Sequence, residues 1–405
     1  MLQTTMRVVA LLATLTVATL AMADAKKVII TIEKPGPIVE TSAKPPFTGK
    51  RAAVDVAILL DTSNSMDGLI RQAKGQLWTI VQQFAEAQKN GQTPILRVAL
   101  FEYGNTRLPA AEGYIRQVVP LTDDLDKLSE ALFALSTKGG DEYCGQVIDE
   151  ALTRLDWSQA RGGYKAIFIA GNEPFTQGSV DYQSSCKRAI EKGVIVNTIH
   201  CGNHEAGVDG KWRHGAQLAE GEFFNIDQDR KIVHIDCPQD EIIIKLNAEL
   251  NKTYLWYGSR SLRENFARNQ VAQDVNASEE SNSVAVSRFA TKAGSAYRNL
   301  NRCLVDTMME DADILEKVKE EELPEVLQNL KPDKRKAYVK DLVAKRQELQ
   351  KRIVRLAAER ETHLAKQRKR LVGEGTLGGA VVMAIEKQLV QSGFGVTQAD
   401  GRRKY

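Results

Sequence analysis

A short run of oxygen-bearing side chains is the part of this sequence with the clearest chemistry. Asp61, Ser63 and Ser65 stand at alternate positions in an Asp-x-Ser-x-Ser pattern, so one carboxylate and two hydroxyl groups can converge on one point. Carboxylate, hydroxyl and water oxygens suit a hard divalent cation, Mg²⁺ first, with Mn²⁺ or Ca²⁺ as substitutes. The plainer alternative is that these residues only cap a helix that begins near Asp67.

The residues around this motif indicate a strand followed by a helix. Residues 54–60 form a continuous apolar run interrupted only by Asp55, which is typical of a strand buried on both faces. Beyond the motif, apolar residues recur at steps of three and four and form one helix face. They are Leu69, Ala73, Leu77, Ile80, Val81 and Phe84. The motif is therefore expected at the carboxyl end of a buried strand, where sheets of this kind bind ligands.

The alternation of strand and helix patterns continues to about residue 226. Further strands are expected at 95–103, 115–121, 165–170, 194–200 and 222–226. Helices are expected at 125–135, 147–155, 182–191 and 216–220. This order predicts an α/β fold with a doubly wound, mostly parallel sheet covered by helices on both faces.

The strand at 54–60 running into Asp61, Ser63, Ser65 and Gly68 resembles the von Willebrand factor type A domain and its metal-ion-dependent adhesion site. The resemblance covers residues 52–230 and implies a Rossmann-like fold. It also implies that the Asp and the two Ser are joined by a Thr or an acidic residue of a second loop, and often by an Asp of a third. The cation held there would keep an open position that accepts a carboxylate from a protein ligand.

In the second and third loops this sequence matches the family's ligand pattern less closely. Asp141 is the second-loop candidate, with Thr137 as a weaker one. In the third loop, Gly171 stands where the family usually has Asp. Asn172 or Glu173 is then expected to supply an oxygen, directly or through water. The missing carboxylate predicts a weakly held ion, and a scaffold that kept the fold without tight metal binding is the alternative.

The chain has five cysteines, which fit an oxidising compartment. They are Cys144, Cys186, Cys201, Cys237 and Cys303. On the expected fold, the first three lie toward one edge of the sheet beside the proposed site. We favour a disulfide between Cys186 and Cys201 over one that uses Cys144, and three buried thiols are the alternative.

The first 23 residues match a secretory signal peptide. Arg7 precedes an apolar run of about 16 residues that ends in Ala21-Met22-Ala23, and this run is shorter than a bilayer span requires. Cleavage is expected after Ala23, which would place the mature chain in a periplasm or a secreted space. An uncleaved membrane anchor is the alternative. Residues 24–51 contain four prolines and are interpreted as a linker.

After Pro238 the strand pattern ends and helical patterns continue to about residue 390. Helices are expected at 241–250, 262–275, 283–318, 324–330 and 333–371. The domain organisation expected from these patterns is an α/β domain at 52–230, a helical or coiled-coil region at 239–390 and a tail at 391–405.

Charge in the helical region is uneven. Residues 306–325 contain nine acids against two lysines, and residues 331–370 contain fifteen Lys and Arg against five acids. With Pro332 between them, these segments predict a long helical hairpin with complementary flanks. A narrow apolar seam in the basic segment suits coiled-coil packing. Its residues are Leu342, Leu349, Ile353, Leu356 and Leu364. The excess positive charge of 331–370 is either solvated or meets an anionic envelope surface or an acidic protein.

Composition narrows the function. The chain has 405 residues with 55 Lys and Arg against 52 Asp and Glu, and this near balance argues against a nucleic-acid binder. The first hypothesis is an exported, non-enzymatic adhesion or scaffold protein that presents a cation to a partner's Asp or Glu. The second is a metal-independent scaffold that its basic helix tethers to an anionic envelope component. A metal-dependent hydrolase or enzyme subunit is disfavoured, because the sequence offers no evident general base or second ligand cluster.

Overall fold

A computed structural model describes residues 51–85, 87–159, 162–230, 236–371, 376–397 and 403–404. These residues fall within one compact unit, residues 46–405. The expected signal peptide and all but the last residue of the expected linker lie outside the described residues. Among the described helices, none combines the length and the apolar character needed to cross a membrane.

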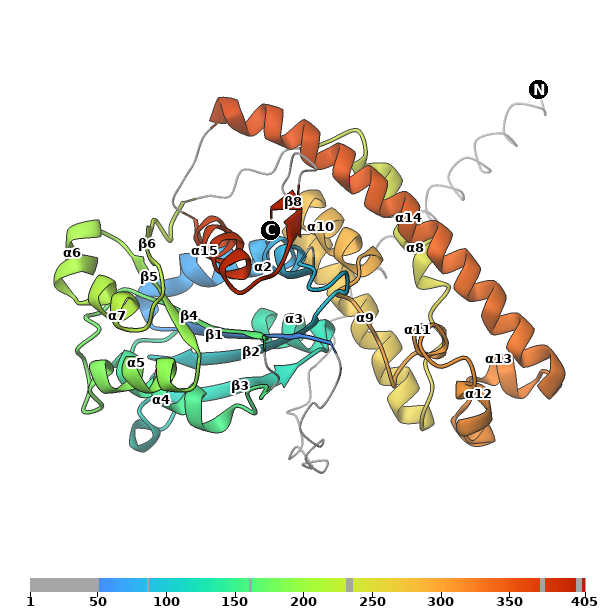
Figure 1. Cartoon of the computed structure of the whole chain (residues 1–405), viewed down its shortest axis with the longest axis horizontal. Helices are drawn as coiled ribbons and strands as arrows, with labels where there is room; N and C mark the ends of the chain where they lie inside the picture. The colour runs from blue at the N-terminus through green and yellow to red at the C-terminus, as the bar shows by residue number, and fades with distance from the viewer. Residues whose placement is uncertain are drawn as a thin grey trace, which may run out of the picture. The chain divides into compact units, whose positions relative to one another are not determined.

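A six-stranded sheet with the order β3-β2-β1-β4-β5-β6 organises the part of the chain between residues 53 and 226 (Figure 1). Its strands are β1 (Ala53–Asp61), β2 (Ile95–Tyr103), β3 (Ile115–Thr122), β4 (Tyr164–Gly171), β5 (Ile195–Cys201) and β6 (Phe223–Ile226). Neighbouring strands pair in parallel except β2 and β3, which are antiparallel. The expected mostly parallel α/β fold is confirmed.

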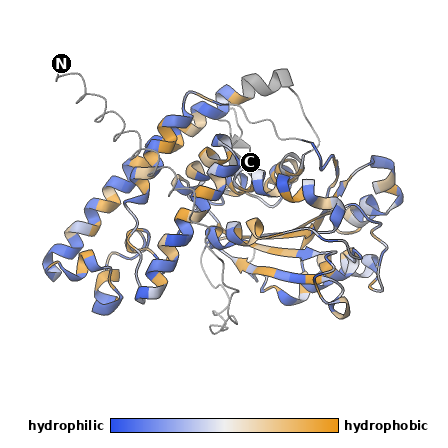
Figure 2. Cartoon of the chain, turned by 180° about the vertical axis from the view of Figure 1, so that it is seen from behind, coloured by the Kyte–Doolittle hydropathy of each residue, from blue (hydrophilic) through white to orange (hydrophobic). Residues whose placement is uncertain are grey.

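Helices cover both faces of this sheet because its strands are apolar on both sides (Figure 2). Val56 of β1 and Leu69 belong to the buried core on one face, and Leu59 of β1 and Val147 belong to the core on the other. The helices of this part are α2 (Asp67–Ala85), α3 (Leu125–Phe133), α4 (Cys144–Arg154), α5 (Tyr182–Glu191), α6 (His204–Asp209) and α7 (Trp212–Leu218). Two short 3₁₀ helices, η1 (Asn64–Met66) and η2 (Ala110–Glu112), lie in the loops.

An all-helical region follows. Its elements are α8 (Asp240–Asn251), α9 (Arg260–Glu280), α10 (Asn282–Ala293), α11 (Leu304–Met308), α12 (Ile314–Lys317), η3 (Glu320–Glu322), α13 (Glu325–Gln328) and α14 (Pro332–Leu371). The long helix α14 begins at Pro332, because a proline at the first helical position loses no hydrogen bond there.

The single helix expected at 283–318 is wrong. After α10, the Gly294 N–H caps the Thr291 carbonyl at 3.0 Å, and Asn301 adopts a left-handed φ of 63°. Asn tolerates this conformation better than most residues, so the chain turns there instead of continuing as a helix. The Leu304 N–H then donates to the Leu255 carbonyl at 2.8 Å, which ties the turn to the segment after α8.

Helix α14 packs against α8, α10 and α11 of the same chain, not against one helical partner. Leu349, Ile353 and Leu364 of the expected seam are buried in this packing. Within the acidic segment, Asp306 binds the fully buried Arg346, and Asp313 lies 3.2 Å from Lys336. The complementary charges of the two segments are therefore confirmed, but the acidic segment consists of short helices instead of one hairpin arm.

Helix α15 (Leu377–Gln391) returns to the sheet and packs beside α2 (Figure 1). The Leu377 N–H donates to Gln72 Oε1 at 2.9 Å. At the other end, buried Gln388 accepts a hydrogen bond from the Tyr164 hydroxyl at 2.7 Å and donates to Asn197 Oδ1 at 2.6 Å. Helix α15 thus covers part of the same sheet face as α2. The short strands β7 (Val396–Thr397) and β8 (Arg403–Lys404) follow it.

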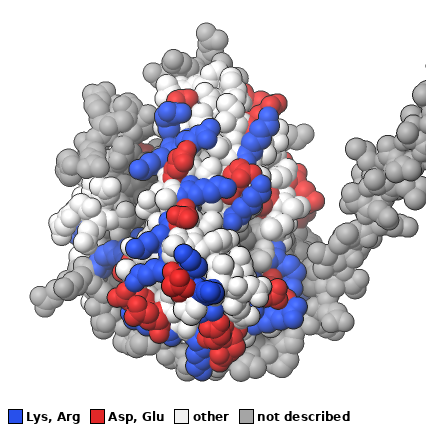
Figure 3. All heavy atoms as spheres, turned by 90° about the vertical axis from the view of Figure 1, so that its right-hand side faces the viewer, with Lys and Arg blue, Asp and Glu red and all other residues white. Residues whose placement is uncertain are grey.

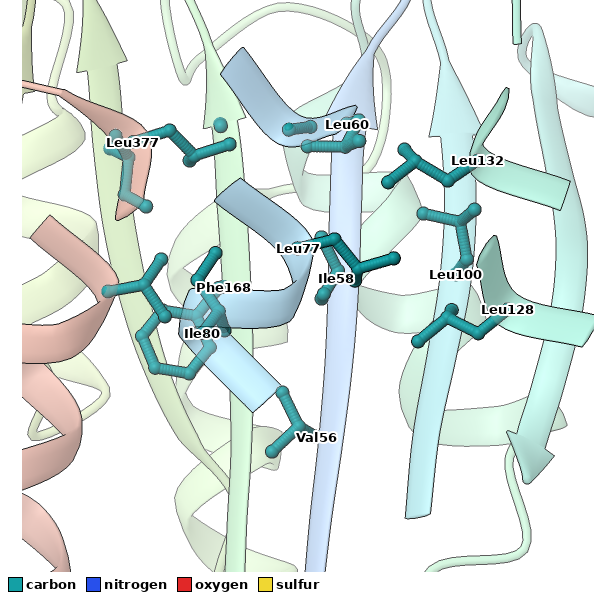
Figure 4. A pocket seen from close by; sticks show the side chains of 14 residues that line it. Val56, Ile58, Leu60, Leu77, Ile80, Leu100, Leu128, Leu132, Phe168 and Leu377 are labelled. Atoms are coloured by element: carbon teal, nitrogen blue, oxygen red, sulfur yellow. The ribbon is translucent and has the colours of Figure 1, made fainter. Parts of the chain in front are cut away.

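A small apolar cavity lies between the sheet, α2, α3 and α15 (Figure 4). Its volume is about 30 Å³, and its walls include Ile58, Leu77, Leu100, Phe168 and Leu377. Every residue that lines it is apolar, so it offers no group for catalysis or for holding an ion.

A buried charged cluster joins α3 to α9 and α10. Arg288 pairs with Asp126 at 2.9 Å and with Asp274 at 2.6 Å, and its guanidinium lies over the Trp78 ring at 4.7 Å. Lys292 pairs with Asp274 at 2.8 Å. Both cations are fully buried, so removing either acid would leave charge without compensation in the interior.

Candidate metal centre

The Asp-x-Ser-x-Ser residues lie where β1 ends, at the carboxyl edge of the sheet. The Thr62 N–H donates to the Tyr103 carbonyl of β2 at 2.8 Å, and the Thr62 carbonyl accepts from the Lys138 N–H at 2.9 Å. The Met66 side chain is buried in the core below the loop. These contacts fix the loop from two neighbouring segments and from beneath.

Asp61 is fully buried, and one of its two carboxylate oxygens lacks a partner. Oδ1 accepts from the Ser63 N–H at 2.8 Å, whereas Oδ2 makes no hydrogen bond although it is buried. Burial raises the pKa of Asp61 to about 7, against the opposing effect of the Ser63 hydrogen bond. A buried carboxylate oxygen without a hydrogen-bond donor lowers the stability of the fold unless a proton or a cation binds it.

Two serine hydroxyls lie beside this carboxylate. Ser63 Oγ and Ser65 Oγ are 3.3 Å apart, and Asn172 Nδ2 donates to Ser65 Oγ at 3.2 Å. Ser63 is buried, whereas Ser65 is exposed. The structure therefore brings Ser63, Ser65 and Asn172 together, and the Ser65 side of the site is open to solvent.

Glu142 is the carboxylate that the second loop turns toward Asp61. A Cβ atom placed on Gly104 would lie 2.7 Å from Glu142 Cγ and 2.9 Å from Asp61 Oδ1, so both acids flank one point. Burial, followed by the charges of Asp61 and Glu173, raises the pKa of Glu142 to about 8. The Glu142 N–H is fixed by Gln177 Oε1 at 2.6 Å. Sequence reasoning missed this residue, although it directly follows the predicted ligand.

The two second-loop candidates lie elsewhere. Asp141 is exposed and accepts a hydrogen bond from the Tyr143 hydroxyl at 3.2 Å. The Thr137 hydroxyl donates to Asp67 in the first turn of α2. Neither side chain contacts Asp61, Ser63 or Ser65 through a hydrogen bond in the described structure.

Gly171 in the third loop has no room for a side chain. A Cβ atom there would lie 2.4 Å from Tyr103 Oη and 3.1 Å from Asp61 Oδ2. The Tyr103 hydroxyl, which donates to the Ala170 carbonyl at 3.0 Å, fills this space. The departure from the Asp expected by resemblance therefore has a packing cause.

The rest of the third loop is held from below. His200 Nε2 lies 3.2 Å from the Asn172 carbonyl, and Trp212 Nε1 donates to the Glu173 carbonyl at 2.8 Å. Asn172 Oδ1 is buried without a hydrogen-bond partner, and Glu173 is half-buried. Asn172 thus adds a second unsatisfied oxygen to the site, while Glu173 contributes negative charge near Asp61.

The donor set fits a hard divalent cation. It combines the free oxygen of Asp61, the hydroxyls of Ser63 and Ser65, and the nearby carboxylate of Glu142. Within the described residues, no three His, Cys, Asp or Glu side chains form a metal cluster. A site here is therefore of mixed carboxylate and hydroxyl type, which favours Mg²⁺, Mn²⁺ or Ca²⁺ over ions that prefer nitrogen or sulfur.

The expected Cys186–Cys201 disulfide is wrong, and so is its alternative through Cys144. Cys144, Cys186 and Cys201 are all free thiols, and all three are buried. Cys144 and Cys186 belong to the core on one face of the sheet, whereas Cys201 belongs to the core on the other. The sheet separates the favoured pair, and burial raises the pKa of all three thiols.

The basic segment 331–370 presents a mixed surface. Five of its cations pair with acids elsewhere in the chain: Arg335, Lys336, Lys345, Arg346 and Arg360. Figure 3, which faces the α12–α14 side, shows Lys and Arg interspersed with Asp and Glu. Side chains of residues 365–370 lie outside the described ones. The described part of α14 therefore offers no uniform basic face.

Comparison with known proteins identifies the α/β part. Residues 55–209 match the von Willebrand factor type A domain family, so this chain contains such a domain followed by a helical region. A search of curated proteins found no match.

Three solved structures are similar to this part of the chain. BatB from Bacteroides thetaiotaomicron is 19% identical with a TM-score of 0.33, over 43% of this chain and 91% of that one. The SpRpn10 VWA domain is 18% identical with a TM-score of 0.35, over 44% and 91%. Proximal thread matrix protein 1 from the mussel byssus, with a zinc-occupied MIDAS motif, is 14% identical with a TM-score of 0.34, over 44% and 43%.

Proposed function

We propose that the von Willebrand factor type A domain at residues 55–209 is a protein-binding module of adhesion or scaffold type. In this proposal, Asp61, Ser63 and Ser65 hold a divalent cation and present it to an Asp or Glu carboxylate of a partner protein. Domains of this family are mostly non-catalytic binding modules, which supports binding over hydrolysis.

The observation that carries the proposal is the unsatisfied oxygen of Asp61. Oδ2 is buried without a hydrogen-bond donor, beside two serine hydroxyls that are 3.3 Å apart. A fold tolerates such a group at a cost of about 1–3 kcal/mol, and cation binding would offset that cost. Ser65 is exposed, so a partner's carboxylate can approach the site from solvent.

Glu142 would supply the second negative charge of the centre. The usual third-loop carboxylate has no room at Gly171, and Glu142 brings a carboxylate from the second loop instead. Two carboxylates would hold the cation more tightly than Asp61 alone, because affinity rises with the charge of the ligands. Mg²⁺ is the first candidate, with Mn²⁺ or Ca²⁺ as alternatives, and when bound the ion would attract an external carboxylate.

We also propose that the protein acts outside the cytoplasmic membrane, in a periplasm or a secreted space. The support is the signal-peptide pattern of residues 1–23. Tethering of the basic helix to an anionic envelope component is the weaker hypothesis, because Arg335, Arg346 and Arg360 are already paired within the chain.

Calorimetric titration with MgCl₂, MnCl₂ and CaCl₂ tests the metal site. We expect the wild-type chain from Asp24 onward to bind at least one of these ions at one site, and Asp61→Ala to abolish the heat of binding. Asp333→Ala is the matched control, because Asp333 is an exposed acid at the start of α14. Absence of binding by the wild-type chain, or equal binding by Asp61→Ala, would overturn the proposal.

A further inference from the structure

We propose that the partner of the metal centre carries a second acidic group, which binds Arg107 and Lys138 beside the cation. This inference rests on the proposed function, and it narrows the partner from any accessible carboxylate to a segment with two acids. The first acid would bind the cation at Asp61, Ser63 and Ser65. The second acid would bind Arg107, in the loop after β2, and Lys138, in the loop before α4.

The two basic side chains, Arg107 and Lys138, lie on loops that are hydrogen-bonded to the loop of Asp61, Ser63 and Ser65 or to each other. The Lys138 N–H donates to the Thr62 carbonyl at 2.9 Å, and Thr62 stands between two of the proposed ligands. The next residue, Gly139, donates its N–H to Asn64 Oδ1 at 2.7 Å. The backbone of Lys138 is therefore held in a fixed position relative to the loop of Asp61, Ser63 and Ser65.

Arg107 is placed by the same set of contacts. Its N–H donates to Asn105 Oδ1 at 3.0 Å, and Asn105 Nδ2 donates to the Ser136 carbonyl at 2.8 Å. The Thr106 N–H donates to the Gly139 carbonyl at 3.0 Å. The loop after β2 and the loop before α4 thus form one interlocked rim that carries both cations.

The loop after β2 and the loop before α4 also pack closely against each other. A Cβ atom on Gly140 would lie 2.5 Å from the Gly104 carbonyl oxygen. Close backbone approach of this kind leaves little freedom for the two loops to separate. A rigid rim matters because a preorganised anion site loses less entropy when its ligand binds.

Neither cation has an acidic partner in the described part of the chain. Arg107 and Lys138 are both exposed, and neither takes part in an ion pair there. In the described structure the Arg107 guanidinium donates to a neutral group, the Ser136 hydroxyl, at 2.6 Å. A partner's carboxylate can therefore bind both side chains without breaking an existing ion pair.

Three other arginines of the α/β part are already paired with acids of the same chain. Arg116 pairs with Glu102, Arg154 with Glu150, and Arg188 with Asp149. Within the described residues Arg107 and Lys138 form no ion pair, and they lie beside the loop where an acidic partner is expected. The charge complementarity thus favours an acidic protein segment as the occupant.

The second contact adds orientation and a moderate gain in affinity. Exposed ion pairs contribute little, so we expect its loss to weaken binding about three- to tenfold. Because salt screens exposed charges, this part of the affinity should fall with ionic strength.

Selection from a random peptide library tests the inference. Phage-displayed dodecapeptides are bound to the chain from Asp24 onward in MgCl₂ and eluted with EDTA. We expect the eluted peptides to share two acids at a fixed spacing. One such peptide is then synthesised with and without its second acid replaced by the corresponding amide, and the dissociation constants of both forms are measured.

Two double variants complete the experiment. Arg107→Gln/Lys138→Gln should bind the two-acid peptide about three- to tenfold more weakly and should not distinguish it from the amide form. Lys351→Gln/Arg352→Gln, an exposed Lys and Arg pair on α14, should behave like wild type. Equal binding by the rim variant, or enrichment of peptides that share only one acid, would overturn this inference and leave the metal site intact. If EDTA elutes no enriched peptide, the proposed function itself fails.

Discussion

The Tyr103 hydroxyl occupies the space that a side chain at position 171 would need. A Cβ atom on Gly171 would lie 2.4 Å from Tyr103 Oη, a separation that real Cβ atoms essentially never show. Tyr103 is fully buried and its hydroxyl is bonded to the Ala170 carbonyl, so it cannot move aside freely. Together these two residues explain why position 171 of the candidate centre carries no carboxylate.

Substitution of Gly171 should therefore destabilise the fold. Gly171→Ala is expected to lower the free energy of unfolding by about 1–3 kcal/mol through overpacking. Tyr103→Phe removes the obstructing oxygen, so the alanine should cost less in the Tyr103→Phe background. Urea denaturation of the two single variants and the double variant measures this coupling. Additive effects of the two substitutions would contradict the steric explanation.

Glu142 and Asp141 should differ in their effect on metal binding. Glu142→Gln removes a carboxylate beside Asp61, and we expect metal affinity to fall at least about tenfold. Asp141→Asn changes an exposed side chain and should leave affinity within about twofold. Calorimetric titration with Mn²⁺ compares the two adjacent positions. A larger loss at Asp141 than at Glu142 would show that the second loop is arranged differently around the ion.

Stability of the metal-free protein should fall as the pH rises. The pKa values of Asp61 and Glu142 are about 7 and about 8, above their ordinary values of 3.8 and 4.5. The folded state therefore binds these protons more tightly than the unfolded chain. This contribution to stability is fully present below about pH 4 and is lost as the pH rises through 7 and 8.

Urea denaturation in EDTA between about pH 5 and pH 9 measures this effect. We expect Asp61→Asn/Glu142→Gln to show a flatter pH dependence than wild type, because the two titrating groups are gone. Added Mn²⁺ should stabilise wild type most at high pH, where the cation no longer competes with protons. The account would be wrong if both proteins showed the same dependence on pH.

Helix α15 should contribute to the stability of the type A domain. Gln388→Ala leaves the buried Tyr164 hydroxyl and Asn197 amide without their partner, and we expect a loss of about 2 kcal/mol. Its neighbour Lys387 is exposed and pairs with Glu222, so Lys387→Ala should cost less than about 1 kcal/mol. Thermal unfolding compares the two variants. Equal losses would mean that α15 adds little to the sheet face.

The sequence predicted the sheet well because its strands have strong local signals. Residues 95–103 and 182–191 match β2 and α5 residue for residue, and the expected strand at 54–60 lies within β1. These segments are apolar runs or periodic patterns bounded by polar residues, so local sequence and tertiary burial agree. The break after Ala293 was missed because helix-forming residues lie on both sides of it. The chain turns at Gly294 and Asn301, and these two residues are a weak signal against that background.

The site was predictable where its geometry follows from a single loop. Asp61, Ser63 and Ser65 converge because they alternate directly after a strand. The choice between Asp141 and Glu142 depends on how the second loop turns, which Gln177 helps to fix from a distant segment. The expected cysteine pairing was wrong because Cys186 and Cys201 belong to the cores on opposite faces of the sheet, which local sequence does not reveal.

Anomalous diffraction from crystals grown with Mn²⁺ tests the central claim most directly. The account predicts one strong anomalous peak within bonding distance of Asp61 Oδ2 and of the Ser63 and Ser65 hydroxyl oxygens, with Glu142 next to the ion. It also predicts a free coordination position on the solvent side. A crystal saturated with Mn²⁺ that shows no peak at Asp61, or a peak held only by other residues, would contradict it.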